Sequence, residues 1–200
     1  MRELVAATRN KDKAREIKSI LKDIDIKILD LDDFENVPDI EEDGKTFEEN
    51  ASKKARIISG FTRRAAIADD SGLEVDALGG RPGVKSARFA GDEADYGKNN
   101  EKLLRLLKGV PPSGRKARFV CVIAIAKDGK VLDTVKGTCA GWIALGPKGA
   151  NGFGYDPLFV SPEHGKTFAE LASAVKNKIS HRYRALSKAK ESIKDLLTVL

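Results

Sequence analysis

The chain has 200 residues, of which 41% are hydrophobic and 33% are charged, and its formal net charge is +6. This composition is that of a globular protein with a sizeable core and excludes a disordered chain. Because no apolar run approaches the length of a membrane span and residues 1–5 lack the pattern of a signal peptide, we expect no membrane partner and a cytoplasmic location.

The positive charge permits an anionic partner such as a polyphosphate. Lysines and arginines are mixed with acidic residues along the sequence, and it contains neither an aromatic RNA-binding motif nor a dense basic tract, so we expect no nucleic-acid partner. Cys121 and Cys139 lie in apolar runs and lack the spacing of metal-binding or redox pairs. They are predicted to be buried free thiols of a reducing compartment.

Strands and helices alternate in the first part of the chain. Residues 4–7 and 25–31 are predicted strands. Between them, apolar residues recur at intervals of three and four from Ala14 to Ile24, which predicts a helix with one face on the core.

A second helix is predicted to begin at a capping box formed by Thr46 and Glu49 and to end near Gly60. A short buried strand over residues 65–69 follows it. A third helix is expected at residues 94–107, ahead of a run of proline and glycine.

The second half opens on a predicted hairpin. Residues 117–126 and 131–145 are rich in strand-forming side chains, and Asp-Gly at 128–129 favours a tight turn of primed geometry. A glycine-rich loop over 146–157 and a last helix from near Ser180 complete the chain. The sequence therefore predicts a mixed α/β fold in which a long antiparallel hairpin joins or extends two lobes.

Two adjacent carboxylates, Asp69 and Asp70, end the predicted strand at 65–69, and Ser71-Gly72 is interpreted as its exit turn. Side chains alternate along a strand, so the two carboxylates are expected on opposite faces, with only one reaching a cleft. A carboxylate so placed can hold a divalent metal or orient a water molecule. The alternative is an acidic pair that ends a strand in solvent.

Thr8, Asn10 and Lys13 lie at a predicted turn from strand to helix. A helix N-terminus favours anions, and these side chains add hydrogen bonds and a positive charge, so the turn can bind a triphosphate. It lacks the glycine spacing of a Walker loop. Ordinary helix capping by Thr8 or Asn10, with a solvated lysine, explains the segment equally well.

Three further polar groups stand at the ends of predicted elements. The acidic run at 41–44 precedes the second helix, and taken alone it is interpreted as complementing the N-terminus of that helix. The segment 152–157 pairs glycines with aromatic rings that can stack on a base, although it also fits a tight structural loop. Lys176 precedes Ser180-His181-Arg182, where a basic pair opposes the helix dipole and calls for an anion or a neighbouring carboxylate.

In this order and spacing, these segments resemble the inosine triphosphate pyrophosphatase family, the house-cleaning purine nucleoside-triphosphate pyrophosphatases. The resemblance runs from residue 4 to about residue 186, nearly the whole chain. The matching segments are residues 8–13, 46–51, 68–73, 79–83 with 86–89, 99–104, 153–157, 167–170 and 180–182.

The resemblance implies a single domain over residues 1–200, with an elongated α/β fold, a mixed central sheet, flanking helices and a nucleotide cleft between two lobes. It also implies a homodimer. The implied activity is that of an XTP/dITP diphosphatase, which uses Mg²⁺ to cleave ITP, dITP or XTP between the α and β phosphates. The products are the monophosphate and pyrophosphate, so deaminated purines leave the nucleotide pool.

Residue by residue, the resemblance implies that Asp70 is the proton acceptor and a metal ligand and that Glu41 is a second metal ligand. Arg9 stands where many members have a small residue. The implied substrate contacts are Thr8, Arg9, Asn10, Lys11, Asp12, Lys13, Ser71, Phe153, Gly154, Tyr155, Asp156, Lys176, His181 and Arg182.

Base choice follows from hydrogen-bonding polarity. Hypoxanthine and xanthine present O6 as an acceptor and N1–H as a donor, whereas adenine reverses both. Asp156 accepting from N1–H, with Arg182 or His181 donating to O6, would leave buried groups unpaired against ATP. Guanine shares both groups, so GTP must be rejected through its 2-amino group.

Two other classes of function remain open. One is a different nucleotide hydrolase or phosphatase, which would release orthophosphate. The other is a non-catalytic module that binds nucleotides or nucleic acid. The acidic residues Glu41, Asp69 and Asp70 argue against that module, because carboxylates repel phosphates unless a cation intervenes.

Overall fold

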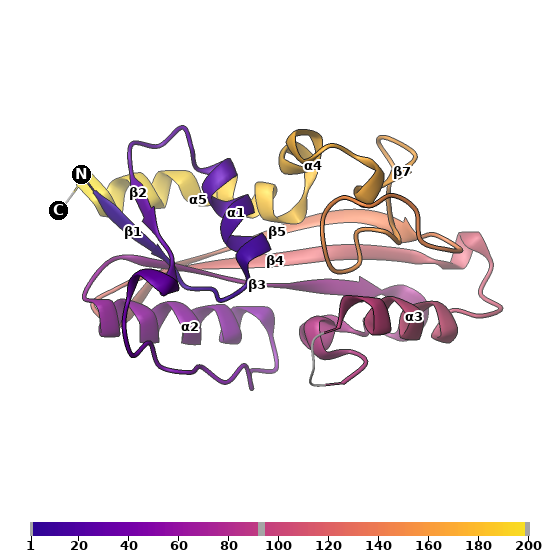
Figure 1. The fold of residues 1–200 in the computed structure, drawn as a ribbon, viewed down its shortest axis with the longest axis horizontal. Coiled ribbons are helices and arrows are strands. Elements are labelled where there is room, and N and C mark those ends of the chain that lie inside the picture. Colours follow the sequence, from indigo (N-terminus) through magenta and orange to yellow (C-terminus); the bar gives the residue numbers. More distant parts are fainter. Residues whose placement is uncertain (1, 92–94, 199–200) are drawn as a thin grey trace. The chain divides into compact units, whose positions relative to one another are not determined.

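The computed structural model describes residues 2–91 and 95–198. The described residues form a mixed seven-stranded sheet with the order β2-β1-β3-β4-β5-β6-β7 (Figure 1). The strands are β1 Glu3–Ala6, β2 Lys27–Leu29, β3 Ala66–Val75, β4 Lys116–Lys127, β5 Lys130–Ile143, β6 Phe159–Ser161 and β7 Lys166–Thr167. The helices are α1 Lys11–Ile20, α2 Phe47–Thr62, α3 Tyr96–Leu106, α4 Ser173–Ile179 and α5 His181–Thr198.

Both strand directions occur in the sheet. β1 pairs in parallel with β2 and β3, while β6 pairs antiparallel with β5 and β7. The predicted α/β class with a mixed sheet is therefore confirmed. The chain divides into two compact units, and β3, β4 and β5 run through both. Unit 1 comprises the described residues of 1–70, 121–137 and 182–200, and unit 2 those of 71–120 and 138–181.

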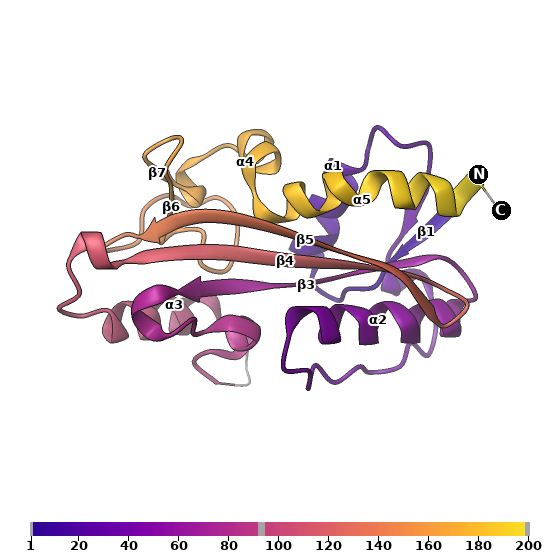
Figure 2. The same ribbon diagram turned by 180° about the vertical axis from the view of Figure 1, so that it is seen from behind.

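In unit 1, α1 and α5 cover one face of the sheet and α2 covers the other (Figures 1 and 2). Residues 4–6 of β1 are completely buried, as expected of a strand covered on both faces. Ile17 of α1, Ile67 of β3 and Ala189 of α5 meet in one core cluster. The predicted apolar stripes of the first and last helices supply this core, although α1 ends at Ile20 and Ile24 packs against the core from beyond the helix.

In unit 2, α3 lies on one face of the sheet and α4 on the other (Figures 1 and 2). Its core is aromatic: the rings of Phe119 and Phe159 are 4.5 Å apart, and those of Phe159 and Phe168 are 5.0 Å apart. Leu73 of β3 and Leu103 of α3 complete this cluster and are fully buried. Unit 2 thus has a core of its own.

The predicted hairpin is confirmed. β4 and β5 are joined by Asp128 and Gly129, whose φ angles of 50° and 72° both lie in the left-handed region. Positive φ at both central residues matches the strand twist that a primed turn requires. The two cysteines are buried free thiols, as predicted.

The first difference between the structure and the prediction concerns β3. Ser71-Gly72 does not end this strand, because β3 continues to Val75. Leu73 and Val75 are completely buried in the core of unit 2, so the strand keeps its apolar alternation after the acidic pair. The prediction of an exit turn was wrong, and Asp69 and Asp70 lie in the middle of a long strand.

Two helices also differ from expectation. α2 passes through Gly60 and ends at Thr62, two residues beyond the predicted end. The left-handed residue that caps the helix is Arg63, with a φ of 52°, and not the predicted glycine. α4 was not predicted, since its seven residues are too short to show a periodic pattern. The predicted helix start at Ala94 lies outside the described residues.

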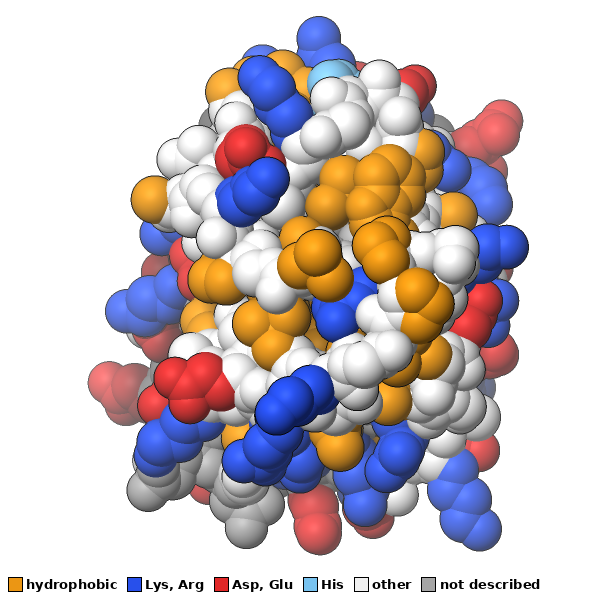
Figure 3. Space-filling view, turned by 90° about the vertical axis from the view of Figure 1, so that its right-hand side faces the viewer, with side chains coloured by type: hydrophobic (Ala, Val, Ile, Leu, Met, Phe, Trp, Pro, Cys, Tyr) orange, Lys and Arg blue, Asp and Glu red, His pale blue; other side chains and the backbone are white. Residues whose placement is uncertain are grey.

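Among the described residues, no helix is long and apolar enough to cross a membrane. Hydrophobic side chains gather in the middle of the face seen in Figure 3. Exposed apolar residues of unit 2 include Trp142 and Leu145, which are 36% and 69% exposed. Together with Pro112 and Pro147 they line a hollow of about 400 Å³ in unit 2.

Candidate functional site

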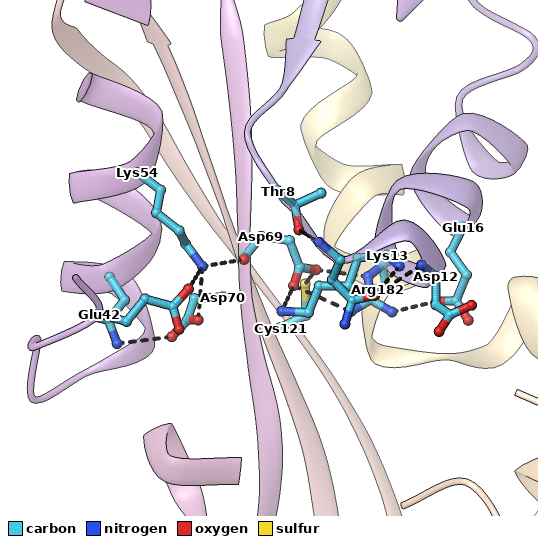
Figure 4. A network of polar contacts seen from close by, with 12 residues as sticks. Thr8, Asp12, Lys13, Glu16, Glu42, Lys54, Asp69, Asp70, Cys121 and Arg182 are labelled. Carbon is cyan, nitrogen blue, oxygen red and sulfur yellow. Dashed lines mark hydrogen bonds and ion pairs between the residues drawn. The ribbon is translucent and has the colours of Figure 1, made fainter. Parts of the chain in front are cut away.

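Asp69 and Asp70 project from opposite faces of β3 (Figure 4), which confirms the predicted alternation. Asp69 faces α1 and the start of α5, and Asp70 faces α2. Both side chains are buried, with 0% and 5% exposure. The alternative of a solvated acidic pair is therefore wrong, because each carboxylate lies among charged partners of unit 1.

Asp69 is held by cations and a thiol. Its carboxylate accepts from Arg182 Nε at 2.8 Å and from Cys121 Sγ at 3.0 Å, and Lys13 Nζ lies 2.6 Å away. Arg182 also pairs with Glu16. Burial alone would raise the pKa of Asp69, but the charges of Arg182 and Lys13 outweigh it and hold that pKa well below its usual range. Asp69 is thus a permanent anion that fixes two cations.

The turn between β1 and α1 places Lys13 beside Asp69. Asn10 Oδ1 accepts from the backbone N–H groups of Asp12 and Lys13, each at 3.0 Å, and Thr8 Oγ1 accepts from Asn10 N at 3.1 Å. Capping by Asn10 is therefore present. Lys13 is not the solvated residue of the alternative interpretation, since its side chain is only 15% exposed.

Arg9 and Lys11, from the same turn, lie elsewhere in unit 1. Both line a hollow of about 300 Å³ together with Arg15 and Lys18. Arg9 donates to Asp39 at 2.9 Å, and Lys11 Nζ is 3.6 Å from the carboxylate of Asp32. The predicted phosphate-binding segment therefore has its positive charges on two sides of α1.

Asp70 meets a buried lysine that the sequence analysis did not select. Lys54 Nζ donates to Asp70 Oδ1 at 3.1 Å, to Glu42 Oε1 at 2.5 Å and to the carbonyl of Asp69 at 2.9 Å. Burial raises the pKa of Asp70, and the opposing charges of Lys54 and Lys13 only partly offset it. Burial would lower the pKa of Lys54, but Asp70 and Glu42 outweigh it, so this pKa is raised and the ammonium stays charged.

The carboxylate oxygens around Lys54 are ligands of the kind that a hard divalent cation prefers. Asp70 and Glu42 bring their carboxylates to one shared positive charge, so the ammonium marks a place where a cation is held by oxygen ligands. Mg²⁺ takes one or two protein carboxylates and completes its shell with water and phosphate oxygens. The described residues contain no group of three or more His, Cys, Asp or Glu side chains that could hold a metal ion.

Glu41 was the predicted second metal ligand, and the side chain that contacts Lys54 is that of the next residue, Glu42. Glu41 is exposed. Both belong to the segment that leads into α2, and this segment is bound to the helix by Asn50 and Lys53.

A second polar cluster lies in unit 2. Lys176 of α4 pairs with Asp156, and both side chains are buried, with 3% and 2% exposure. Lys176 Nζ also lies 4.7 Å from the ring centroid of Phe153. Asp156 Oδ2 accepts from the backbone N–H of Phe153 at 2.9 Å, which closes the loop on itself. The loop and α4 thus present an aromatic ring, a carboxylate and an ammonium together.

The other predicted residues of unit 2 are placed by their neighbours. Tyr155 is buried and donates to the carbonyl of Ser86 at 2.8 Å, and burial raises its pKa. The carbonyl of Gly154 accepts from Asn100 of α3 at 2.9 Å. His181 stacks on Phe119 with ring centroids 4.6 Å apart. Ser71 lies in β3, next to Asp70 in sequence.

We expect replacement of Gly152 by Ala to disorganise this loop. The φ of Gly152 is +74°, and a Cβ there would lie 2.0 Å from Asp156 Oδ2. The left-handed backbone alone costs a non-glycine residue about 1–3 kcal/mol. The variant should therefore lose thermal stability and show a raised KM for its substrate. Calorimetry and steady-state kinetics measure the two effects.

Gly165→Ala is the matched control. Gly165 has a φ of +62°, and a Cβ there meets nothing within 4 Å. It should lose a similar amount of stability with no change in KM. An equal rise in KM for both variants would show that backbone strain, and not the position of Asp156, controls substrate binding.

The sequence analysis missed Asn50, Lys54, Glu42 and Cys121. A signal for the first two exists, because the buried side chains of α2 follow one helical stripe that includes both polar residues. A lysine and an asparagine inside an otherwise apolar stripe indicate a buried polar partner. Glu42 stands in the acidic run at 41–44, of which only Glu41 was predicted as a ligand, and Cys121 carried no such signal.

Known proteins of one family match this chain over nearly its whole length. A sequence model described as the Ham1 family matches residues 4–192. A protein of Geobacillus kaustophilus named dITP/XTP pyrophosphatase is 50% identical over 197 residues, which cover 98% of this chain and 97% of that protein. A protein of the same name from Desulforamulus reducens is 52% identical over 193 residues, covering 96% of each.

Solved structures agree with the sequence comparison. A HAM1 protein from Coxiella burnetii aligns with a TM-score of 0.86 at 43% identity, covering 98% of this chain and all of that one. The Staphylococcus aureus Ham1 protein aligns with a TM-score of 0.85 at 40% identity, covering 97% and 99%. With the sheet, the paired aspartates and the loop clusters in place, the chain belongs to the Ham1 family.

Proposed function

We propose that this protein hydrolyses the deaminated purine nucleoside triphosphates ITP, dITP and XTP to the monophosphate and pyrophosphate, and so removes them from the nucleotide pool. The observation that carries the proposal is the opposed pair on β3: Asp69 anchors Lys13 and Arg182, while Asp70 shares a cation with Glu42. One strand thus anchors two cations of the neighbouring helices through Asp69 and supplies a carboxylate for a metal through Asp70. The names of the relatives support the substrate class.

The phosphate chemistry assigns roles to the residues of unit 1. Asp70 orients or deprotonates the water that attacks the α-phosphorus in line. Asp70 with Glu41 or Glu42 would hold Mg²⁺, which would offset the charge of the polyphosphate and polarise the phosphorus. Lys13, fixed by Asp69, shares the negative charge of the departing pyrophosphate. Lys54 neutralises Asp70 and Glu42 until substrate arrives.

The base is recognised by the residues of unit 2 in this proposal. Phe153 offers a ring on which a purine can stack, and Asp156 accepts from the N1–H of hypoxanthine or xanthine. His181, buried against Phe119, is the donor we favour for O6. Arg182 is less suited to this task, since Asp69 and Glu16 already engage its guanidinium and it is 1% exposed.

A panel of nucleoside triphosphates with Mg²⁺ tests the proposal. We expect kcat/KM for ITP, dITP and XTP to exceed that for ATP and GTP by about 100-fold or more, because the wrong base leaves buried polar groups unpaired. Pyrophosphate and orthophosphate are measured separately. Release of orthophosphate would indicate another nucleotide hydrolase, and equal use of GTP and ITP would refute the base assignment.

A binding module without catalysis predicts a different result. It would bind single-stranded or duplex nucleic acid tightly, with strong dependence on salt, and would not turn over ITP. The buried carboxylates of Asp69 and Asp70 support the enzyme, since a phosphate approaching Asp70 needs a cation between them.

We also propose that the protein is a cytoplasmic homodimer. The two buried free thiols suit a reducing compartment. Exposed apolar side chains such as Trp142 and Leu145 suit a surface that a second copy covers. Sedimentation of the wild type beside Leu145→Asp tests this: a dimer that the charge converts to monomer supports it, and a wild-type monomer contradicts it.

A further inference from the structure

Asn50 connects two parts of the Asp70 cluster through a single amide. It lies on α2 and is 2% exposed. Its Nδ2 donates to Asp70 Oδ2 at 3.3 Å, and its Oδ1 accepts from the backbone N–H of Gly44 at 2.8 Å. The amide nitrogen therefore contacts Asp70, the candidate metal-binding carboxylate. The amide oxygen holds the segment that carries Glu41 and Glu42.

The approach of Gly44 to this amide is unusually close. A Cβ at Gly44 would lie 2.5 Å from Asn50 Oδ1 and 2.9 Å from Glu49 Cβ. Gly44 is not among the residues with a positive φ. The glycine is therefore needed for close contact with Asn50 and not for its backbone conformation.

The same segment brings Glu42 to Lys54, where it shares the ammonium with Asp70. Only one residue separates Glu42 from Gly44, so the hydrogen bond from Gly44 to Asn50 limits where Glu42 can lie. The amide donates to the carboxylate from its nitrogen and accepts from the Gly44 N–H at its oxygen. A carboxylate at position 50 could not donate, and an aliphatic side chain could do neither.

We propose that Asn50 is a positioning residue that sets the carboxylates of Asp70 and of the Glu41-Glu42 segment in the arrangement that holds the divalent metal. This inference rests on the proposed function. Asn50 itself is not expected to contact metal or substrate, and its effect passes through Asp70 and Gly44.

Asn50→Leu tests this, because leucine has a similar size and removes both hydrogen bonds. Binding of Mn²⁺ to the protein without substrate is measured by electron paramagnetic resonance, and kcat and KM for ITP are measured with Mg²⁺. We expect Mn²⁺ affinity and kcat to fall by about 10- to 100-fold, as for other residues that orient metal ligands. KM for ITP should change little, since base recognition is untouched.

Asn99→Leu is the matched control in unit 2. Asn99 is also 2% exposed and also binds a loop through both ends of its amide, accepting from Ala90 N at 2.6 Å and donating to the carbonyl of Ala87 at 2.8 Å. Both variants should lose thermal stability. Only Asn50→Leu should lose Mn²⁺ affinity; wild-type Mn²⁺ affinity in Asn50→Leu, or an equal loss in Asn99→Leu, would overturn the proposal.

Gly44→Ala provides a second variant should Asn50→Leu fail to fold. Its methyl group displaces the Asn50 oxygen, so Mn²⁺ affinity should fall in the wild-type background. In an Asn50→Ala background, where that oxygen is absent, Gly44→Ala should lower Mn²⁺ affinity much less. Additive losses of affinity from the two substitutions would contradict a contact between Gly44 and Asn50 that positions the metal ligands. If wild type releases no pyrophosphate, the proposed function fails, whereas the Mn²⁺ measurements judge Asn50 separately.

Discussion

Replacing Asp70 with Asn is expected to lower kcat for ITP by about 10²–10⁴-fold, the range for loss of a general base. The fold should remain intact. Burial raises the pKa of this carboxyl, so its charge opposes folding, and an amide of the same size removes that charge. Lys54 keeps Glu42 as its partner in the variant. We therefore expect a Tm close to that of the wild type together with almost no turnover.

Asp43→Asn is the control for charge in the same region. Asp43 is an exposed residue of the segment before α2, and its carboxylate pairs with Lys53 at 2.6 Å. Neutralising it loosens one exposed contact of this segment and should lower kcat far less than Asp70→Asn does. Pyrophosphate release, followed continuously, measures both variants, and a kcat near that of the wild type for Asp70→Asn would remove Asp70 from the mechanism.

The sequence was sufficient wherever local periodicity decides the structure. The helix stripe that begins at Ala14, the Asp128-Gly129 turn and the opposite directions of Asp69 and Asp70 all follow from the repeat of a helix or a strand. Each depends on residues that are close in sequence. These features were confirmed.

The sequence was insufficient where a distant contact overrides a local preference. Ser71-Gly72 has the composition of a turn, yet burial of Leu73 and Val75 in unit 2 keeps it in a strand. Gly60 resembles a helix stop, yet α2 continues through it to Thr62 and is capped by Arg63. A single sequence does not contain these partners, so tertiary packing alone decides between turn and strand.

In the candidate site, too, some residues could be predicted from the sequence and others could not. Family motifs identified Asp70 and Lys13, which stand in recognisable segments. Lys54 and Asn50 contact Asp70 from one turn apart on α2, and their role becomes evident only once α2 lies against β3. Cys121 reaches Asp69 from 52 positions away in the chain. The residues that complete the site are those brought together by folding.

The two aspartates therefore have different tasks although they are neighbours in sequence. Asp69 is surrounded by donors that neutralise it permanently, which suits a structural anion. At Asp70, burial and the like charge of Glu42 outweigh the opposing charges of Lys54 and Lys13 and raise the pKa, which suits a residue that exchanges partners during a reaction. The alternation of β3 separates the two environments, so the same substitution should give opposite results at the two positions.

Asp69→Asn is expected to lower the free energy of unfolding by about 3–5 kcal/mol, the range for removing one partner of a buried ion pair. Lys13 and Arg182 would then lie buried without the anion that fixes them. For a chain of this size the loss corresponds to about 6–20 °C in Tm. Asp70→Asn, the same change at the next residue, is the matched control, and equal Tm values for the two variants would contradict the assignment.

The pH dependence of unfolding gives a second test of Asp69. Its pKa is lowered in the folded state, so its contribution is complete above the unfolded pKa of about 3.9 and disappears as pH falls through the lower folded value. The stability difference between wild type and Asp69→Asn should therefore be constant near neutral pH and shrink below about pH 4. Urea unfolding across this range measures it. A difference that grows on acidification would mean that Asp69 is protonated in the folded protein and cannot anchor Lys13 and Arg182.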